Sequence, residues 1–476
     1  MLLAYTLSFV RDVILTEEPV TGHVALQLPG RQVTLRQVSP TLREILHLLA
    51  KTGATEQQLT DKALKAGGTV ELALLKYFLQ LCTERCLLQY SVLEDGLPLA
   101  TAVPLSAKFQ FQPVSTFPGQ TYILSRFAYC RRDDDQLVLE SPLSFAQVRL
   151  QGWKGAALIA ELVKPCQHGP AGMAIPGMTL EVASAVLSLL AGVGMLTSTQ
   201  EHERSQEDEN ATLRQWEFHD LLFHSRSRLG RHAQPVGGSY RFLGKIEPLP
   251  AVRPVLLDRV ISLEKPDLAL LMEQDRSLTS VLEYRRSLRK YGEQSITLRH
   301  LGEFLYRTAR AKPIHTENQQ DRYCRPYAGA GGIFELELYI AVNCCDGLPA
   351  GLYHYYPVTH QLVYIFERTA DVAALLHSAE QAVGGGCTAQ VLIIIAARFQ
   401  RVSWQYQSIA YSLILKDVGV LFQTMYLVAT AMDLAPCALG TGDSDLFAQT
   451  IGTDYYAETS VGEFLLGTRA TNALVP

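Results

Sequence analysis

Apolar and polar residues alternate over three short stretches near the start of the chain, and this alternation predicts half-buried strands. The stretches are residues 5–10, 23–28 and 32–35. A helix-entry pair, Ser39-Pro40, then precedes an apolar stripe from Leu42 to Leu49, and helical spacing continues over 55–66 and 69–84. A strand-like run at 87–90 closes the segment. This succession is typical of a winged helix-turn-helix.

Residues 120–198 repeat the plan. Strand-like runs at 122–127 and 136–140 lead to Ser141-Pro142, and helical patterns cover 151–163 and 180–191. The repetition predicts a degenerate internal duplication, although two apolar patterns can also agree by chance.

The pattern changes after about residue 265, where helices and strands mix. Helices are predicted at 277–286, 297–308, 369–382 and 411–432. Strands are predicted at 336–342, 361–366, 391–397 and 464–466. The helix at 411–432 is apolar on nearly all sides, which predicts a buried central helix.

These patterns predict an α+β chain of four parts. They are a winged-helix module at 1–97, a second winged-helix-like module at 98–212, a helix and linker at 213–264, and an α+β domain at 265–476.

Composition narrows the function. The chain has 42 Lys and Arg against 47 Asp and Glu, 48% apolar residues and 19% charged residues. These values exclude a disordered chain and argue against a nucleic-acid partner, which usually calls for a basic excess. The longest apolar stretches, 185–196 and 391–397, are too short to span a bilayer.

The cysteines and histidines give no sign of a disulfide framework or a metal site. The nine cysteines include no CxxC pair, and the start lacks the basic region of a signal peptide, so we expect a cytoplasmic protein with reduced thiols. The spacing of His219, His224 and His232 suits no single helix face, so no metal is expected.

Basic residues gather at the end of one predicted helix. Arg285, Arg286 and Arg289 surround Ser287, and guanidinium groups four positions apart share a helix face. Two such groups can fork onto one phosphate. A solvated helix end is the alternative interpretation.

Three further segments carry candidate chemistry. Gly329, Gly331 and Gly332 precede a strand and would let the main chain approach a flat ligand, or form an ordinary loop. The segment 436–443 could offer peptide N–H groups to a phosphate or a ring edge. The last predicted strand leads to one more guanidinium, that of Arg469.

In this order, the four segments resemble the nitroreductase-like flavoprotein superfamily. The resemblance is closest to the FMN-dependent azoline oxidases of the cyanobactin type, which act on ribosomally made peptides. The motifs that carry it are Arg285–Arg289, Arg325–Tyr339, Gly347–Tyr355, Ser403–Tyr406, Pro436–Gly442 and the ending at Arg469. The two front modules resemble those that grip leader peptides in peptide-maturation enzymes.

The resemblance implies a nitroreductase-like domain that binds FMN at the interface of a homodimer. It implies that Arg285, Arg286, Ser287 and Arg289 hold the phosphate, the ribityl chain and the pyrimidine edge. It places Gly329, Ala330, Gly331 and Gly332 along the isoalloxazine, from the other subunit. Leu439 and Gly440 would offer main-chain contacts, and Arg469 a phosphate contact.

The chain departs from the family at one pair. Related azoline oxidases carry Lys-Tyr where this chain has Gln405-Tyr406. A glutamine cannot act as a base, so Tyr406 is the stronger candidate, either bonding the substrate or shuttling its proton, and a packing role stays open. Lys290-Tyr291 and Lys416 are weaker alternatives.

The implied function is oxidation of thiazolines or oxazolines in a precursor peptide, with dioxygen reoxidising the flavin. An NAD(P)H-dependent nitroreductase and a non-catalytic recognition scaffold are the alternatives. The sequence leaves open which azolines react, which residue takes the proton, which electron acceptor serves and whether the front modules bind leader peptide.

Overall fold

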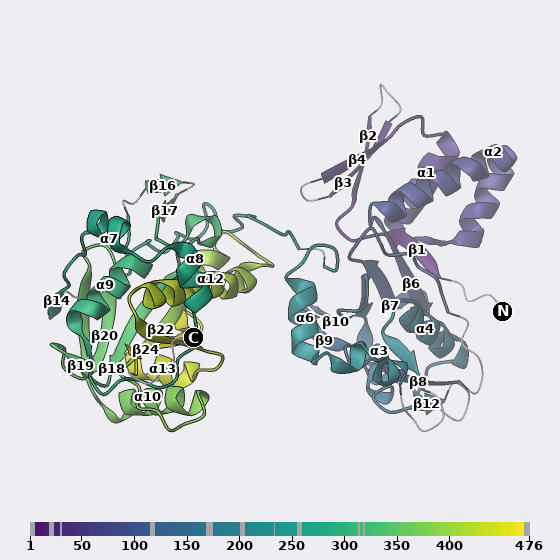
Figure 1. The fold of residues 1–476 in the computed structure, drawn as a ribbon. Coiled ribbons are helices and arrows are strands. Elements are labelled where there is room, and N and C mark those ends of the chain that lie inside the picture. The colour runs from purple at the N-terminus through teal and green to yellow at the C-terminus, as the bar shows by residue number, and fades with distance from the viewer. Residues whose placement is uncertain are drawn as a thin grey trace. The chain divides into compact units, whose positions relative to one another are not determined.

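Two units, residues 1–234 and 235–476, divide the chain (Figure 1). The structure is a computed structural model. It describes residues 5–18, 23–28, 31–114, 120–167, 175–199, 205–232, 234–254, 259–312, 315–317 and 319–470.

A seven-stranded antiparallel sheet runs through the first unit in the order β5-β1-β6-β7-β11-β10-β9. Its strands are β1 (Thr6–Phe9), β5 (Ala54–Thr55), β6 (Leu88–Glu94), β7 (Leu97–Pro104), β9 (Tyr129–Asp133), β10 (Gln136–Glu140) and β11 (Ala146–Leu150). The β6–β7 hairpin joins the two halves, because β6 pairs with β1 and β7 pairs with β11. Both predicted modules therefore share one sheet, which local periodicity does not reveal.

The first half of this unit has the predicted winged-helix content. Its remaining elements are β2 (Ile14–Glu18), β3 (His23–Leu28), β4 (Arg31–Leu35), α1 (Pro40–Lys51) and α2 (Glu56–Glu84). The hydroxyl of Ser39 caps α1 by accepting from the Leu42 N–H, as the helix-entry pair predicts. Non-helical backbone at Gly67 and Gly68 kinks α2, so the two helices predicted there are its two arms.

The second half has its own apolar core. Its remaining elements are β8 (Thr121–Leu124), β12 (Cys166–Gln167), β13 (Leu196–Ser198), α3 (Gly152–Glu161), α4 (Leu180–Gly192), α5 (Gln206–Glu209), the 3-10 turn η1 (Leu213–Gln215) and α6 (Phe218–Arg226). The helix predicted within residues 213–264 is α6. It begins after Glu217, because the carboxylate of Glu217 accepts from two N–H groups of the first turn.

A second seven-stranded antiparallel sheet forms the C-terminal unit, in the order β14-β21-β20-β18-β22-β24-β23. Its strands are β14 (Val260–Ser262), β18 (Leu336–Val342), β20 (Gly351–Tyr356), β21 (Gln361–Glu367), β22 (Val391–Arg398), β23 (Leu434–Leu439) and β24 (Glu458–Thr468). Two short ladders pair β15 (Ile296–Thr297) with β19 (Cys345–Asp346), and β16 (His315–Glu317) with β17 (Gln320–Arg322).

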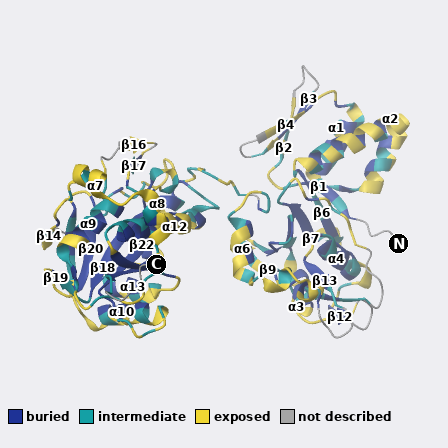
Figure 2. Cartoon of the chain, viewed as in Figure 1, coloured by how far each residue is buried: buried dark blue, intermediate teal, exposed yellow. Residues whose placement is uncertain are grey.

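Helices cover both faces of this sheet. They are α7 (Leu268–Gln274), α8 (Leu278–Tyr284), α9 (Leu298–Ala309), α10 (Ala370–Ala382), α11 (Phe399–Ser403), α12 (Ala410–Ala431) and α13 (Ser444–Ile451), with the 3-10 turn η2 (Ala330–Gly332). Residues of α9 and α12 pack on one face and residues of α10 and α13 on the other. The central strands are thus buried on both sides (Figure 2), which explains the uninterrupted apolar run from Val391 to Ala397 in β22.

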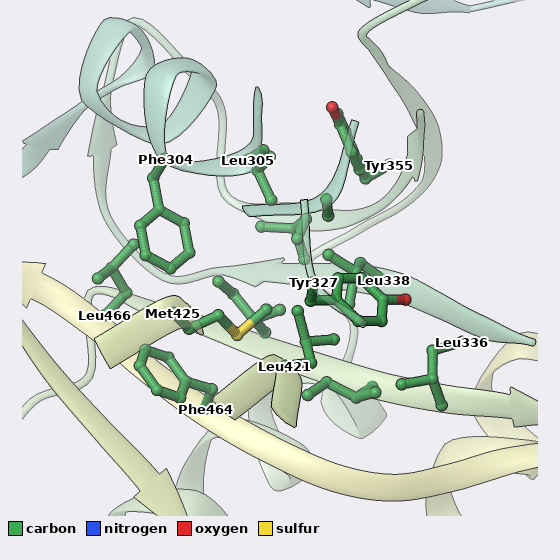
Figure 3. Close-up of a cluster of buried hydrophobic side chains, with 14 of the residues drawn as sticks. Phe304, Leu305, Tyr327, Leu336, Leu338, Tyr355, Leu421, Met425, Phe464 and Leu466 are labelled. Atoms are coloured by element: carbon green, nitrogen blue, oxygen red, sulfur yellow. The ribbon is translucent and has the colours of Figure 1, made fainter. Parts of the chain in front are cut away.

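The predicted central helix is confirmed as α12. It has the length and composition of a membrane-spanning helix. Its inner face, however, packs through Leu421 and Met425 against Phe464 of β24 and Phe304 of α9 (Figure 3). Burial of that face in the core accounts for the apolar sequence.

Replacing Phe464 with alanine tests this core. The ring is fully buried and stacks on Phe304 and Phe422, so its removal should cost about 3–5 kcal/mol of unfolding free energy. In calorimetry of the full chain, the transition of the C-terminal unit should fall by roughly 6–20 °C. Val358→Ala, at a side chain 44% exposed, is the control and should leave that transition in place. Equal shifts for both variants would contradict the packing.

Candidate functional site

The arginine-rich segment leaves the helix before the arginines begin. Helix α8 ends at Tyr284, and Arg285 has extended backbone with φ −55° and ψ 122°. The Leu288 N–H donates to the Pro436 carbonyl at 2.8 Å, so the segment runs beside β23. The predicted helix to Arg286, with Arg285 and Arg289 on one helical face, is therefore wrong. The segment is instead irregular and is held to β23 by this backbone hydrogen bond.

Tyr426 of α12 ties this segment to the sheet. Its hydroxyl accepts from the Ala438 N–H at 2.8 Å and lies 2.7 Å from the Ser287 hydroxyl. Because the phenol already accepts from a peptide, its own proton is available to Ser287. The Arg285 guanidinium lies 5.2 Å from the centre of the Tyr426 ring, and a cation–π interaction with the ring stabilises the guanidinium in this position.

The other predicted arginines lie around the same end of the sheet. Arg289 lies by Cys437 of β23, where its charge opposes the rise in the thiol's pKa that burial causes. Arg469 follows β24 and forms an isolated antiparallel β-bridge with Tyr291 through its backbone. Its guanidinium donates to the Asp433 carboxylate at 2.9 Å. The structure therefore brings Arg285, Ser287, Arg289 and Arg469 to one region, although more than 170 residues separate the first from the last.

Arg286 is placed differently. Its guanidinium donates to the carbonyls of Glu283 and Arg285, both at 2.9 Å, and thereby satisfies the end of α8. It stabilises the turn that presents its neighbours.

We call Arg285, Arg289 and Arg469 the arginine cluster. Among the described residues, Asp433 is the sole carboxylate ion-paired with this cluster, and it also pairs with Arg276 at 3.5 Å. The Nε of Arg469 is buried without a hydrogen-bond partner. The region therefore carries excess positive charge and an unused donor, which suit an anionic ligand.

The glycine loop, Gly329 to Gly332, lies against another part of α12. Gly331 and Gly332 have φ of +60° and +67°, which glycine adopts without strain. The Ala330 N–H donates to both carboxylate oxygens of Asp417, at 2.9 and 3.1 Å. A Cβ on Gly331 would lie 2.7 Å from the Tyr406 hydroxyl, so loop and tyrosine are direct neighbours.

Gln405 and Tyr406 have different surroundings. Gln405 is buried; its side-chain oxygen accepts from Arg322 at 3.2 Å and its carbonyl from the N–H groups of Ser239 and Tyr240. Arg322 also donates to the Gly331 carbonyl, so Gln405 is a structural link to the loop. Burial raises the pKa of Tyr406, whose phenol therefore keeps its proton at neutral pH.

A cavity of about 390 Å³ opens beside the third predicted segment. Its walls are one face of α12, strand β24, the last residue of β23, Leu439, and the turn that follows from Gly440. Glu463 lines it, and this side chain is 2% exposed with no hydrogen-bond partner for Oε1. Burial and the nearby negative charge of Asp443 raise the pKa of Glu463 to about 7.

Tyr426, Arg322, Asp417 and Glu463 were not among the site residues predicted from the sequence. Glu463 left a usable signal, because it is a single charge beside the apolar run Phe464-Leu465-Leu466. Tyr426 and Arg322 left none, since their roles depend on partners more than eighty residues away.

The described residues contain no group of three His, Cys, Asp or Glu side chains placed to hold a metal. The residues that the structure gathers are instead arginines, tyrosines, glycines and buried carboxyls. They can bind an anion, accept a flat ring against exposed backbone, and exchange a proton.

Three sequence families match the chain. Residues 1–113 match the ThcOx helix-turn-helix domain, residues 122–233 match the cyanobactin oxidase ThcOx, and residues 282–467 match the nitroreductase family. Residues 114–121, 234–281 and 468–476 lie outside these matches.

Individual proteins are similar to the C-terminal part. A protein of Methanocaldococcus jannaschii, provisionally named a nitroreductase, is 28% identical over 167 residues, which are 35% of this chain and 80% of that protein. A solved structure from Ralstonia eutropha, also provisionally named a nitroreductase, is 18% identical to this chain. The match covers 50% of this chain and 100% of that protein, with a TM-score of 0.34. Another, from Desulfovibrio desulfuricans and in complex with FMN, is 14% identical, covers 43% and 92%, and has a TM-score of 0.29.

The raised pKa of Glu463 predicts a pH-dependent stability difference. Well below pH 4.5 the carboxyl is protonated in both folded and unfolded chains, so its ionisation does not affect the stability. Between pH 4.5 and about 7 the unfolded chain ionises first, so the folded state loses at most about 3 kcal/mol as pH rises. Glu463→Gln removes this loss.

Thermal unfolding of both proteins from pH 4 to 8 measures the effect. The melting temperature of the variant minus that of the wild type should increase as pH rises from 4.5 to about 7, and this difference should stay constant above pH 7. A constant difference at every pH would show that the pKa of Glu463 is ordinary.

Proposed function

We propose a function for this chain on the premise that it belongs to the cyanobactin oxidase family, with a helix-turn-helix region in front and a nitroreductase-family domain behind. The chain oxidises azoline rings in ribosomally made peptides. Our proposal adds that it uses FMN, which its homodimer holds at the subunit interface, and that dioxygen takes the electrons.

The arginine cluster supports the choice of FMN. A phosphate ester carries close to two negative charges, and forked, charge-assisted donors suit it best. Arg285, Arg289 and Arg469 outnumber their carboxylate, and Arg469 Nε has no partner in the described chain. This excess of guanidinium groups at one end of the sheet is the observation that carries the proposal.

The glycine loop and the turn after β23 supply the rest of the proposed site. Bare backbone at Gly329 to Gly332 can contact a flat ring closely, and Leu439 and Gly440 border the cavity. Asp417 holds the loop in place through the Ala330 N–H. When bound, FMN would supply the two-electron acceptor that ring oxidation requires.

Tyr406 acts as a hydrogen-bond donor in this proposal. Its phenol is protonated at neutral pH, so it can orient the azoline but cannot take a proton from it. Gln405 holds the loop through Arg322 and exchanges no proton.

The front modules bind the precursor peptide in this proposal. A peptide can add as a strand to a sheet edge. The β2-β3-β4 sheet has two edges of this kind, and β9 ends the seven-stranded sheet. Titrating leader peptide into the full chain tests this, and absence of binding would leave the modules a structural role.

Spectroscopy tests the proposed cofactor first. Purified chain, incubated with FMN and desalted, should be yellow and should oxidise a thiazoline peptide with uptake of dioxygen. A colourless protein would refute the proposal. Bleaching by NADH with no effect of the azoline peptide would favour a general nitroreductase, the activity for which the M. jannaschii relative is named.

Removing one guanidinium from the arginine cluster should weaken FMN binding. Losing a charge-assisted hydrogen bond costs about 1.5–3 kcal/mol, so Arg289→Ala and Arg469→Ala should each raise the Kd for FMN roughly 10- to 150-fold. Quenching of FMN fluorescence measures this. Arg299→Ala, at a guanidinium 77% exposed, is the matched control and should leave the Kd unchanged. Wild-type affinity in both cluster variants would remove the phosphate assignment.

Tyr406→Phe separates flavin binding from substrate orientation. It removes only the hydroxyl beside Gly331, so the protein should retain FMN while azoline oxidation slows by about 10-fold or more. Flavin absorbance and mass spectrometry of the peptide read the two effects separately. Full oxidation by this variant would reduce Tyr406 to a packing residue.

A further inference from the structure

A β-bulge and two glycines shape the cavity between α12 and β24. Ile395 pairs with Gly462 and the next residue, Ala396, pairs with Ser460, so Val461 is inserted and β24 is bent at this point. A Cβ on Gly462 would lie 2.7 Å from Val418, and one on Gly442 would lie 2.4 Å from Glu463 Oε1. Any larger residue at Gly442 would displace the carboxyl, so the lack of a side chain at Gly442 leaves room for the carboxyl of Glu463.

Glu463 is the one carboxyl lining this cavity. Its strand neighbours are Ile394 and Leu439, both apolar, and its Oε1 accepts no hydrogen bond. Leaving a buried carboxyl oxygen unpartnered costs stability. A ligand that donates a proton or a hydrogen bond would satisfy it.

Azoline oxidation needs a base, and the other candidates are poorly suited. Gln405 has no ionisable group, and the phenol of Tyr406 is already protonated. Lys416 is exposed on α12. Asp417 is already engaged by the Ala330 N–H. Glu335, although partnerless, is fully buried and does not line the cavity.

We propose that Glu463 is the catalytic base, which accepts the proton on the Cα of the azoline ring inside this cavity. The inference rests on the proposed function. In the step, the Cα–H bond breaks and its proton goes to the Glu463 carboxylate. The adjacent ring carbon loses its hydrogen with both electrons to FMN, and a carbon–carbon double bond forms in the ring. Water then takes the proton from Glu463, and dioxygen takes the two electrons with two protons to give hydrogen peroxide.

The charges around Glu463 suit this role. Burial raises the pKa of Glu463, and Asp443, in the turn before α13, adds charge repulsion. Helix α12 contributes Tyr411 to the same cavity. No Lys or Arg side chain lines the cavity, all of whose lining residues are described. A base with pKa near the working pH combines a usable ionised fraction with good proton affinity.

Two variants test the proposal in the FMN-loaded full chain. Glu463→Gln should bind FMN with wild-type affinity, yet the single-turnover rate with a thiazoline peptide should fall about 10²- to 10⁴-fold. Asp443→Asn keeps a side chain that can cap α13 and removes the charge. The pKa of Glu463 then falls, so the rising limb of the pH–rate profile should move to lower pH.

Glu367→Gln, at an exposed position on β21 of the same sheet, is the control and should change neither measurement. A wild-type rate in Glu463→Gln, loss of its FMN, or an unmoved limb in Asp443→Asn would overturn the inference. If Glu463→Gln fails to fold, the pH–rate profile of Asp443→Asn alone tests the inference. A wild-type chain that binds no FMN would instead defeat the proposed function itself, before any variant is made.

Discussion

Two polar side chains of one buried helix hold the C-terminal unit's candidate site together. Asp417 and Tyr426 lie on α12, about 13 Å apart along its axis, and each bonds a segment from elsewhere in the chain. A carboxylate or phenol in an apolar core is costly unless it is hydrogen-bonded. The glycine loop and the Ser287 segment satisfy these groups, so their positions are coupled to the packing of the helix.

Electrostatics distinguishes the two sides of this helix. The arginine cluster concentrates positive charge near β23, and Asp433 offsets only part of it. The cavity is lined by the carboxyl of Glu463 and by no basic residue, and Asp443 adds a negative charge nearby. A ligand that is anionic at one end and releases a proton at the other would match this separation of charge.

Periodicity predicted the interior of the C-terminal unit well. Strand β18 has the predicted bounds, and α12 is one residue from its predicted start and end, because both are almost entirely apolar over their length. Periodicity failed where distant pairing decides the backbone. Arg285 to Arg289 looked helical because nothing in their own sequence reports the hydrogen bond from Leu288 to Pro436. The proximity of Tyr406 to Gly331 depends likewise on tertiary folding.

The sheet shared by the two front modules limits how this unit can be divided. Cutting the chain in the β6–β7 hairpin would leave β7 with an open edge, and unpaired edges invite association between molecules. Each module also supplies strands that the other needs as neighbours. We therefore expect the two front modules to be gained, lost or exchanged between enzymes together in evolution, although their sequence pattern resembles a tandem duplication.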